Sequence, residues 1–207
     1  MILYCVRHGE SEFNAEGRIQ GQLDTPLSAR GRQQSSAVAA ALAQLPIQAV
    51  FSSPLRRALE TAQLLAGSLK LKVRTDERLK EVNAGIFQGH RHDELPDLYP
   101  DAWRKWQALD PDFVIPEGES RRQLIERGWA ALTAIAATDF EHVAVVAHGN
   151  VLSSAIQSLL GIPPQRAAFR LYNGSISRMQ WNNAVQLLTL NETAHLAGIG
   201  TAGCGDL

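Results

Sequence analysis

Three short apolar runs, each followed at once by polar residues, constrain the fold of this chain most. They span residues 2–6, 49–51 and 143–147, and they are continuous rather than alternating in hydrophobicity. A strand with that pattern is buried on both faces, as in a parallel sheet covered by helices. Helical patterns separate the runs along the chain. The alternation predicts an α/β fold, a three-layer sandwich with a mainly parallel central sheet flanked by helices.

Capping residues and apolar periodicity predict where the helices begin. Ser28 precedes a predicted helix over residues 29–44, and Ser120 with Gln123 forms a capping box ahead of another. Ser53, directly before a proline, is typical of an N-cap followed by the first helical position. The other predicted elements are a strand at 72–74, a short helix at 101–109, a helix at 149–160 and a hairpin of strands at 176–181 and 185–191.

The length and composition predict one domain. At 207 residues with 45% hydrophobic content, the chain can form one sizeable core and is too short for a second. We assign residues 1–197 to this domain. Within it, residues 83–118 are rich in Pro, Asp, Trp and Tyr and are expected to form an excursion over the site. Residues 198–207, with four glycines, are expected to form a flexible tail.

The charge balance argues against a nucleic-acid partner. A net charge of -1 and a pI near 6.6 lack the basic excess of a polyanion-binding surface. No apolar stretch approaches the roughly 20 residues of a membrane span, and the N-terminal run meets charged residues too early for a signal peptide. The two cysteines have no spacing typical of a disulfide framework. We therefore expect a cytoplasmic protein without a nucleic-acid or membrane partner.

Polar side chains gather where the three apolar runs end. Arg7 and His8 follow the first run, Arg57 lies just after the second, and His148 follows the third. The carboxyl ends of parallel strands meet at one edge of a sheet, where ligands bind in open α/β folds. Helices that begin there add N–H donors, and arginines add planar charged donors, both suited to phosphate oxygens. The residues alone thus predict a phosphate pocket with two histidines and two or three arginines.

The motifs and their order resemble those of the histidine phosphatase, or phosphoglycerate mutase-like, superfamily. The first motif is Arg7-His8-Gly9-Glu10-Ser11 with Asn14, and the resemblance extends from residue 2 to about 195. The further matching segments are Gly21, Asp24, Pro26-Leu27-Ser28 and Gly31; residues 52–58 with Glu60-Thr61-Ala62; Leu79-Lys80-Glu81 with Gly85 and Gly89; residues 116–120; and Ala147-His148-Gly149. The resemblance implies a phosphoglycerate mutase-like sandwich.

By this resemblance His8 is a nucleophile that becomes transiently phosphorylated. Arg7, Arg57 and His148 would bind and stabilise the phosphoryl group, and Glu81 would be the general acid for the leaving alcohol. Arg57 is preferred to its neighbour Arg56, because the family places its arginine directly before the alanine, here Ala58. The expected substrate contacts come from Asn14, Gln20 and Gly149.

These roles predict opposite protonation states for the two histidines. His8 attacks phosphorus only when neutral, which nearby arginines favour, whereas His148 serves better as a charged donor. Glu81 must be protonated when the substrate binds. The cations supply the charge that a metal supplies elsewhere, and no carboxylate or thiolate is spaced to close a metal site with His90 and His92. We expect neither a metal nor a cofactor.

The residues are compatible with three functions. The main hypothesis is a phosphomonoesterase for a small cytosolic phosphate ester, with sugar phosphates, phosphoserine, phosphoglycerates, nucleotides and α-ribazole phosphate as candidates. A cofactor-dependent phosphoglycerate mutase shares the core. A catalytically silent regulator that binds a phosphorylated ligand is disfavoured, because no catalytic position is substituted. Hydrolysis is favoured over mutase activity because the excursion is short and mixed in charge, although the pair Arg121-Arg122 could approach the site.

Overall fold

A six-stranded sheet forms the centre of the molecule, with strand order β3-β2-β4-β1-β5-β6. The computed structural model describes residues 1–163, 169–182 and 184–201. The first four strands in that order are parallel, and β5 is antiparallel to both β1 and β6. The bounds are β1 Ile2–Arg7, β2 Ala49–Ser52, β3 Val73–Thr75, β4 His142–Ala147, β5 Ile176–Trp181 and β6 Val185–Glu192. The predicted mainly parallel sheet and the C-terminal hairpin are both confirmed.

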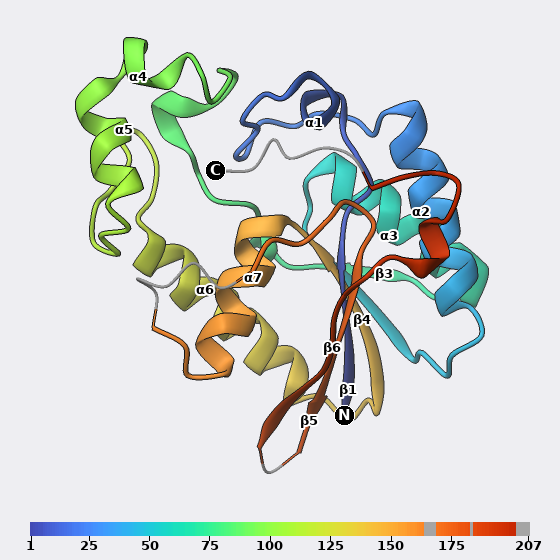
Figure 1. Ribbon diagram of the computed structural model, residues 1–207. Helices are drawn as coiled ribbons and strands as arrows, with labels where there is room; N and C mark the ends of the chain where they lie inside the picture. The colour runs from blue at the N-terminus through green and yellow to red at the C-terminus, as the bar shows by residue number, and fades with distance from the viewer. Residues whose placement is uncertain (164–168, 183, 202–207) are drawn as a thin grey trace.

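Helices cover both faces of this sheet (Figure 1). Successive residues of a strand point to opposite faces, so Tyr4 and Val6 pack with α2 and α3, whereas Leu3 and Cys5 pack with α6 and α7. Two hydrophobic cores result, one on each side, and they explain why the strands are continuously apolar. The helices are α2 Ala29–Leu42, α3 Arg56–Leu69, α6 Arg121–Ala136 and α7 Gly149–Leu159. The predicted three-layer sandwich is therefore correct.

Two of the three predicted helix caps are present, and one is wrong. The Ser28 hydroxyl accepts from the Gly31 N–H at 3.0 Å, and Ser120 with Gln123 forms the capping box of α6. Ser53 does not cap α3, which begins at Arg56 without a side-chain cap. The Ser53 N–H still donates to the Val146 carbonyl at 3.0 Å, so the chain remains extended there and the helix begins later.

The excursion is more helical than predicted. The expected short helix is α5 Pro100–Gln107, but α4 Leu95–Leu98 precedes it, and at four residues it is too short to show a periodic pattern. In Figure 1, α5 (green) lies near the N-terminal end of α6, and α4 lies beyond α5. The start of the excursion is tied to the loop after α1 Glu12–Glu16, because Gly89 donates to the Ile19 carbonyl at 2.8 Å and Ile19 donates to that of His90 at 2.9 Å.

The C-terminal end of the chain is described as far as residue 201. A 3-10 helix, Ala194–Leu196, follows β6, and Gln34 donates to the Gly200 carbonyl at 2.8 Å. Of the predicted flexible tail, residues 198–207, positions 202–207 lie outside the described residues. Within the parts of the chain that the structure describes, no helix combines the length and apolar character needed to cross a bilayer.

Candidate active site

The carboxyl ends of β1, β2 and β4 place His8, Ser53 and His148 next to one another. These strands are neighbours in the sheet, and the His8 N–H donates to the Ala147 carbonyl at 3.0 Å, which keeps their ends level. The rings of His8 and His148 are 5.0 Å apart between centroids and inclined at 62°. Two histidines separated by 140 positions in the chain are thus brought together, as the strand-end pattern predicted.

The hydrogen bonds of His8 define which ring nitrogen is available for attack. Its Nδ1 is 2.6 Å from the Gly9 carbonyl, which can only accept, so Nδ1 carries the proton. The lone pair of neutral His8 therefore lies on Nε2, where the Arg57 Nε–H donates at 3.3 Å. Burial, then Arg57 and Arg7, holds the pKa of His8 well below its ordinary 6.5. His8 is a neutral imidazole with an oriented lone pair.

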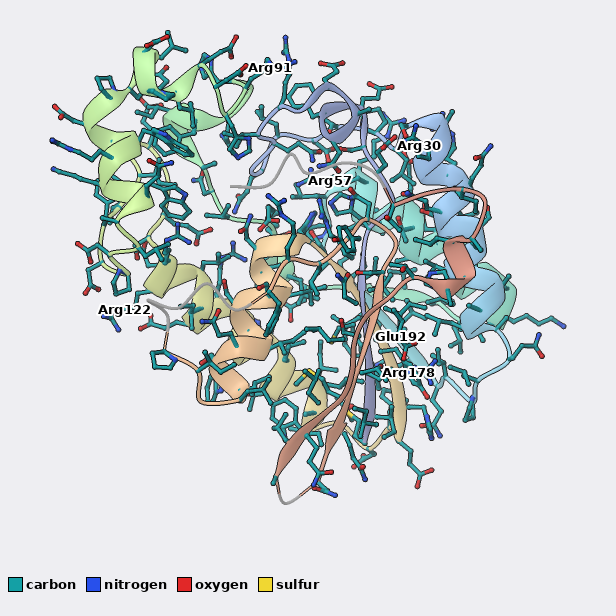
Figure 2. The ribbon with its side chains drawn as sticks, viewed as in Figure 1. Arg30, Arg57, Arg91, Arg122, Arg178 and Glu192 are labelled. Atoms are coloured by element: carbon teal, nitrogen blue, oxygen red, sulfur yellow. The ribbon has the colours of Figure 1, made fainter. Side chains whose placement is uncertain are left out.

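The two arginines beside His8 are fully buried. Arg57 donates from Nη1 to the Leu23 carbonyl at 2.9 Å and from Nη2 to the Gly21 carbonyl at 2.8 Å. Arg7 donates from Nη1 to the Leu171 carbonyl at 2.5 Å. Arg56 instead lies at the surface, where it pairs with a glutamate one helical turn away. The structure thus brings Arg57, and not Arg56, to the nucleophile, near the centre of Figure 2.

His148 lies beside His8, with its Nε2 at 2.8 Å from the Ser53 hydroxyl. Its Nδ1 has no hydrogen-bond partner among the described residues. Burial first, then Arg57, lowers the pKa of His148 well below 6.5. In the free site this shift disfavours the charged His148 that we expected, because burial and a neighbouring guanidinium both disfavour the protonated ring. A bound phosphate dianion would oppose this shift.

Asn14 brings a buried donor to the same pocket. It is the third residue of α1, whose N-cap is Ser11, and its Oδ1 accepts from the Ser11 N–H at 3.2 Å and from Asn173 at 3.1 Å. Its Nδ2 is buried and has no partner among the residues that the structure describes. A buried N–H₂ group without an acceptor is costly, so this position suits an anionic ligand oxygen.

Gln20 and Gly149 occupy supporting positions. The Gln20 Oε1 accepts from the hydroxyls of Ser11 and Thr25, both at 2.6 Å, so its side chain braces the turn that carries Asn14. Gly149 is the first residue of α7, directly after His148, and is buried. The structure gives Gln20 this bracing role, and neither residue is shown to contact a ligand.

Glu81 reaches the pocket from the segment between β3 and the excursion. Its buried carboxylate accepts from the N–H groups of Val82 at 2.8 Å, Asn150 at 3.0 Å and Val151 at 3.2 Å. The last two belong to the first turn of α7, so Glu81 lies next to His148 in space. Backbone donors and a helix N-terminus favour the ionised carboxylate. The expected protonation of Glu81 before the substrate binds stays a prediction.

The sequence reasoning missed two residues of this site. Ser53 was assigned to a helix cap, although its position at a strand end beside the histidines could have indicated a ligand role. Asn173 donates from Nδ2 to the His8 carbonyl at 3.2 Å as well as to Asn14. It precedes Gly174, whose N–H donates to the carbonyls of Arg7 and His8, and the Asn-Gly pair was the only available signal.

Other cationic and metal-binding candidates lie elsewhere. Arg121 stacks over the Trp106 ring at 3.6 Å from its centroid, and burial lowers its pKa to about 10. Arg122 pairs with the exposed Asp112 and lies at the periphery in Figure 2. Neither is directed to His8. In the described residues, no group of three or more His, Cys, Asp or Glu side chains could hold a metal ion.

Comparisons with known proteins identify the family that the chain resembles over nearly its whole length. The model of the histidine phosphatase superfamily (branch 1) matches residues 3–193. The chain is 36% identical over 207 residues, 95% of each chain, to a probable phosphoglycerate mutase GpmB of Proteus mirabilis. A mycobacterial glucosyl-3-phosphoglycerate phosphatase complexed with VO₃ superposes with a TM-score of 0.83 at 33% identity, covering 92% of this chain and 98% of that one. An α-ribazole phosphatase from Shigella flexneri superposes at 0.86 and 29% identity, covering 94% and 98%.

Proposed function

Because the chain belongs to the histidine phosphatase superfamily, we propose that it is a phosphomonoesterase that hydrolyses a small phosphate ester through a phosphohistidine at His8. The observation that carries the proposal is the orientation of the His8 ring. The Gly9 carbonyl holds the proton on Nδ1, and Nε2 faces the Arg57 guanidinium with its lone pair. An imidazole in that state is a nucleophile for an anion that the guanidinium attracts.

The reaction proceeds in two halves. In the first, His8 Nε2 forms a bond to phosphorus as the ester P–O bond breaks, and Arg7, Arg57 and the Asn14 amide stabilise charge on the phosphoryl oxygens. Glu81 protonates the departing alkoxide. In the second half, Glu81 deprotonates a water molecule that attacks the phosphohistidine, and inorganic phosphate leaves.

The hydrogen bonds of Glu81 bear on both of its proposed roles. Three N–H groups donate to its carboxyl oxygens, an arrangement that suits the base of the second half. To act as the acid of the first half, it gains a proton once the substrate is bound, when the added negative charge of the phosphate favours its neutral form.

Hydrolysis is supported over phosphoglycerate mutase activity by the arrangement of the peripheral cations. A mutase must bind a bisphosphorylated intermediate, which requires a second cationic site. In this chain Arg104 pairs with Asp101, Arg122 with Asp112 and Arg91 with Asp93. The nearby carboxylates neutralise the charge that a second phosphate would need. The curated relatives carry mutase names and several structural neighbours carry phosphatase names, so a direct test is required.

The test is incubation with 3-phosphoglycerate and 2,3-bisphosphoglycerate while 2-phosphoglycerate and free phosphate are both followed. We expect negligible interconversion beside phosphate release from a monoester. Fast interconversion without release would overturn the proposal in favour of the mutase. A panel of sugar phosphates, phosphoserine, nucleotides, glucosyl-3-phosphoglycerate and α-ribazole phosphate then ranks the candidate substrates.

The proposal places the protein in the cytoplasm, acting on a phosphorylated metabolite rather than on a nucleic acid or a membrane. The burial of His8, His148, Arg7 and Arg57 supports a small ligand, and the near-neutral net charge supports the absence of a polyanion-binding surface. A catalytically silent regulator is the weaker alternative. It would bind phosphate esters without releasing phosphate from any member of the panel.

A further inference from the structure

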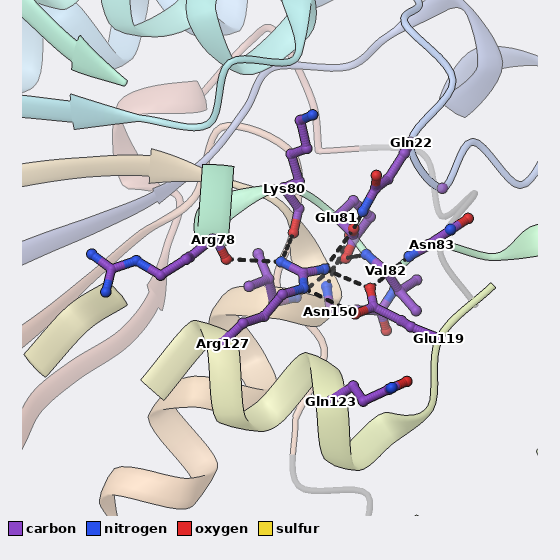
Figure 3. A network of polar contacts seen from close by, with 12 residues as sticks. Gln22, Arg78, Lys80, Glu81, Val82, Asn83, Glu119, Gln123, Arg127 and Asn150 are labelled. Atoms are coloured by element: carbon purple, nitrogen blue, oxygen red, sulfur yellow. Dashed lines mark hydrogen bonds and ion pairs between the residues drawn. The ribbon is translucent and has the colours of Figure 1, made fainter. Parts of the chain in front are cut away.

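One guanidinium holds the backbone of the segment that carries Glu81 (Figure 3). Arg127 projects from α6, and its Nη1 donates to the Arg78 carbonyl at 2.8 Å and to that of Lys80. Its Nη2 donates to the Glu81 carbonyl at 2.7 Å. Three carbonyls within four residues are thus fixed to a single side chain on the neighbouring helix.

Glu119 orients this guanidinium. Its two carboxylate oxygens accept from Arg127 Nη2 at 2.6 Å and from Nε at 3.0 Å, a two-point contact that defines the plane of the arginine. Glu119 also accepts from the Asn83 N–H at 2.7 Å, so it holds the chain on the other side of Glu81. The side chains of Arg127 and Glu119 are 19% and 14% exposed, so solvent screens this pair only partly.

We infer that Arg127 and Glu119 are positioning residues that aim the Glu81 carboxylate at the leaving group. The inference rests on the proposed acid-base role of Glu81. Arg127 donates to the backbone carbonyl of Glu81, while the Glu81 carboxylate accepts from α7. The backbone is therefore held from α6 and the functional group from α7, which restricts both ends of the side chain.

The ion pair has a second consequence for the charge at the site. Glu119 neutralises Arg127, so a guanidinium can lie beneath Glu81 without acting as an uncompensated cation. Removing Glu119 would leave that cation beside Glu81 and would favour its ionised form. The two residues therefore affect Glu81 differently, Arg127 through geometry and Glu119 through geometry and charge.

A residue that only stabilises the fold would affect all substrates alike, whereas a residue that positions the general acid would affect most the substrates that need a proton. This difference in substrate dependence supplies the test. Alkyl phosphates need a proton on the leaving oxygen, whereas p-nitrophenyl phosphate releases an anion that needs none. The variants are Arg127→Met, Arg127→Lys and Glu119→Gln, each compared with Glu81→Gln. Arg122→Met is the matched control, because Arg122 is on the same helix and pairs with a carboxylate away from Glu81.

We expect Arg127→Met to lower kcat for an alkyl phosphate by about 10- to 100-fold and that for p-nitrophenyl phosphate by less than about threefold. Arg127→Lys should recover part of the loss, and Arg122→Met should show none. In the Glu81→Gln background, Arg127→Met should add little, because both changes act on one group. Glu119→Gln should also shift the limb of the alkyl phosphate pH profile that reports Glu81.

Two results would overturn the inference. Equal losses on both substrates, or full additivity of Arg127→Met with Glu81→Gln, would make Arg127 a structural brace. If Glu81→Gln slows both substrates equally, the proposed acid-base role of Glu81 is refuted. That outcome differs from a failure of the positioning role alone, in which Glu81→Gln distinguishes the substrates and Arg127→Met does not. Thermal unfolding of each variant identifies loss of fold, and if Arg127→Met is unfolded, Arg127→Lys and Glu119→Gln decide by the same substrate ratio.

Discussion

Gly31 is the position where an added methyl group should damage both stability and catalysis. It lies in the first turn of α2, and a Cβ there would be 1.8 Å from the Glu10 carbonyl oxygen and 2.7 Å from its carbon. Carbon and oxygen atoms pack at about 3.3 Å or more, so the two backbones must separate by roughly 1.5 Å. Glu10 is two residues beyond His8, and the displacement would move the nucleophile.

The magnitude follows from this clash. Overpacking costs about 1–3 kcal/mol, and we expect the upper part of that range because both partners are backbone. In a chain of this size, such a loss lowers Tm by about 5–10 °C. A nucleophile displaced by about 1 Å loses on the order of 100-fold in rate.

The assay compares Gly31→Ala with Gly67→Ala by thermal unfolding and by p-nitrophenyl phosphate turnover. Gly67 is also helical, in α3, but a Cβ there meets nothing within 4 Å. Gly67→Ala should therefore stabilise the protein by about 0.5–1 kcal/mol, the usual helix preference of alanine, with unchanged activity. If Gly31→Ala is as stable and active as Gly67→Ala, the close packing of α2 against the His8 loop is refuted.

Three further predictions concern the site. His8→Ala should keep less than about a hundredth of wild-type activity and remain folded by circular dichroism; greater residual activity would contradict a covalent role. The pKa values of His8 and His148 are lowered from 6.5 in the folded protein, so the unfolded state takes up protons first as pH falls. Below about pH 6.5, the free energy of unfolding should then decrease by up to about 1.4 kcal/mol per pH unit for each ring. Urea unfolding of His8→Asn at a series of pH values should show a smaller dependence of this free energy on pH than wild type. Activity should survive EDTA; loss on chelation that one divalent ion restores would require a metal.

Much of the fold could be predicted from local sequence. Continuous apolar runs identify buried strands because a strand covered on both faces has no solvent side for polar residues. Ser28 and the Ser120–Gln123 pair predict helix starts because capping depends on residues three apart. The four-residue helix α4 escaped prediction because it spans little more than one turn and has no period to detect.

The same local signals placed His8 and His148 at strand ends, but the protonation states depend on contacts that only the tertiary structure creates. The pKa of His148 is lowered because the ring is buried beside Arg57, 91 residues away in the chain. The Glu81 carboxyl group accepts hydrogen bonds from N–H groups of α7, about 70 residues later in the chain.

Ser53 shows the same division at a single residue. Its sequence context is that of a helix cap. In the structure, however, its backbone N–H donates to the Val146 carbonyl of β4, and its hydroxyl forms a hydrogen bond with His148. The residue type and its neighbours determine which hydrogen bonds it can make. Which of them forms is decided by the parallel pairing of β2 with β4, because that pairing fixes where the strand ends and which side chain lies opposite.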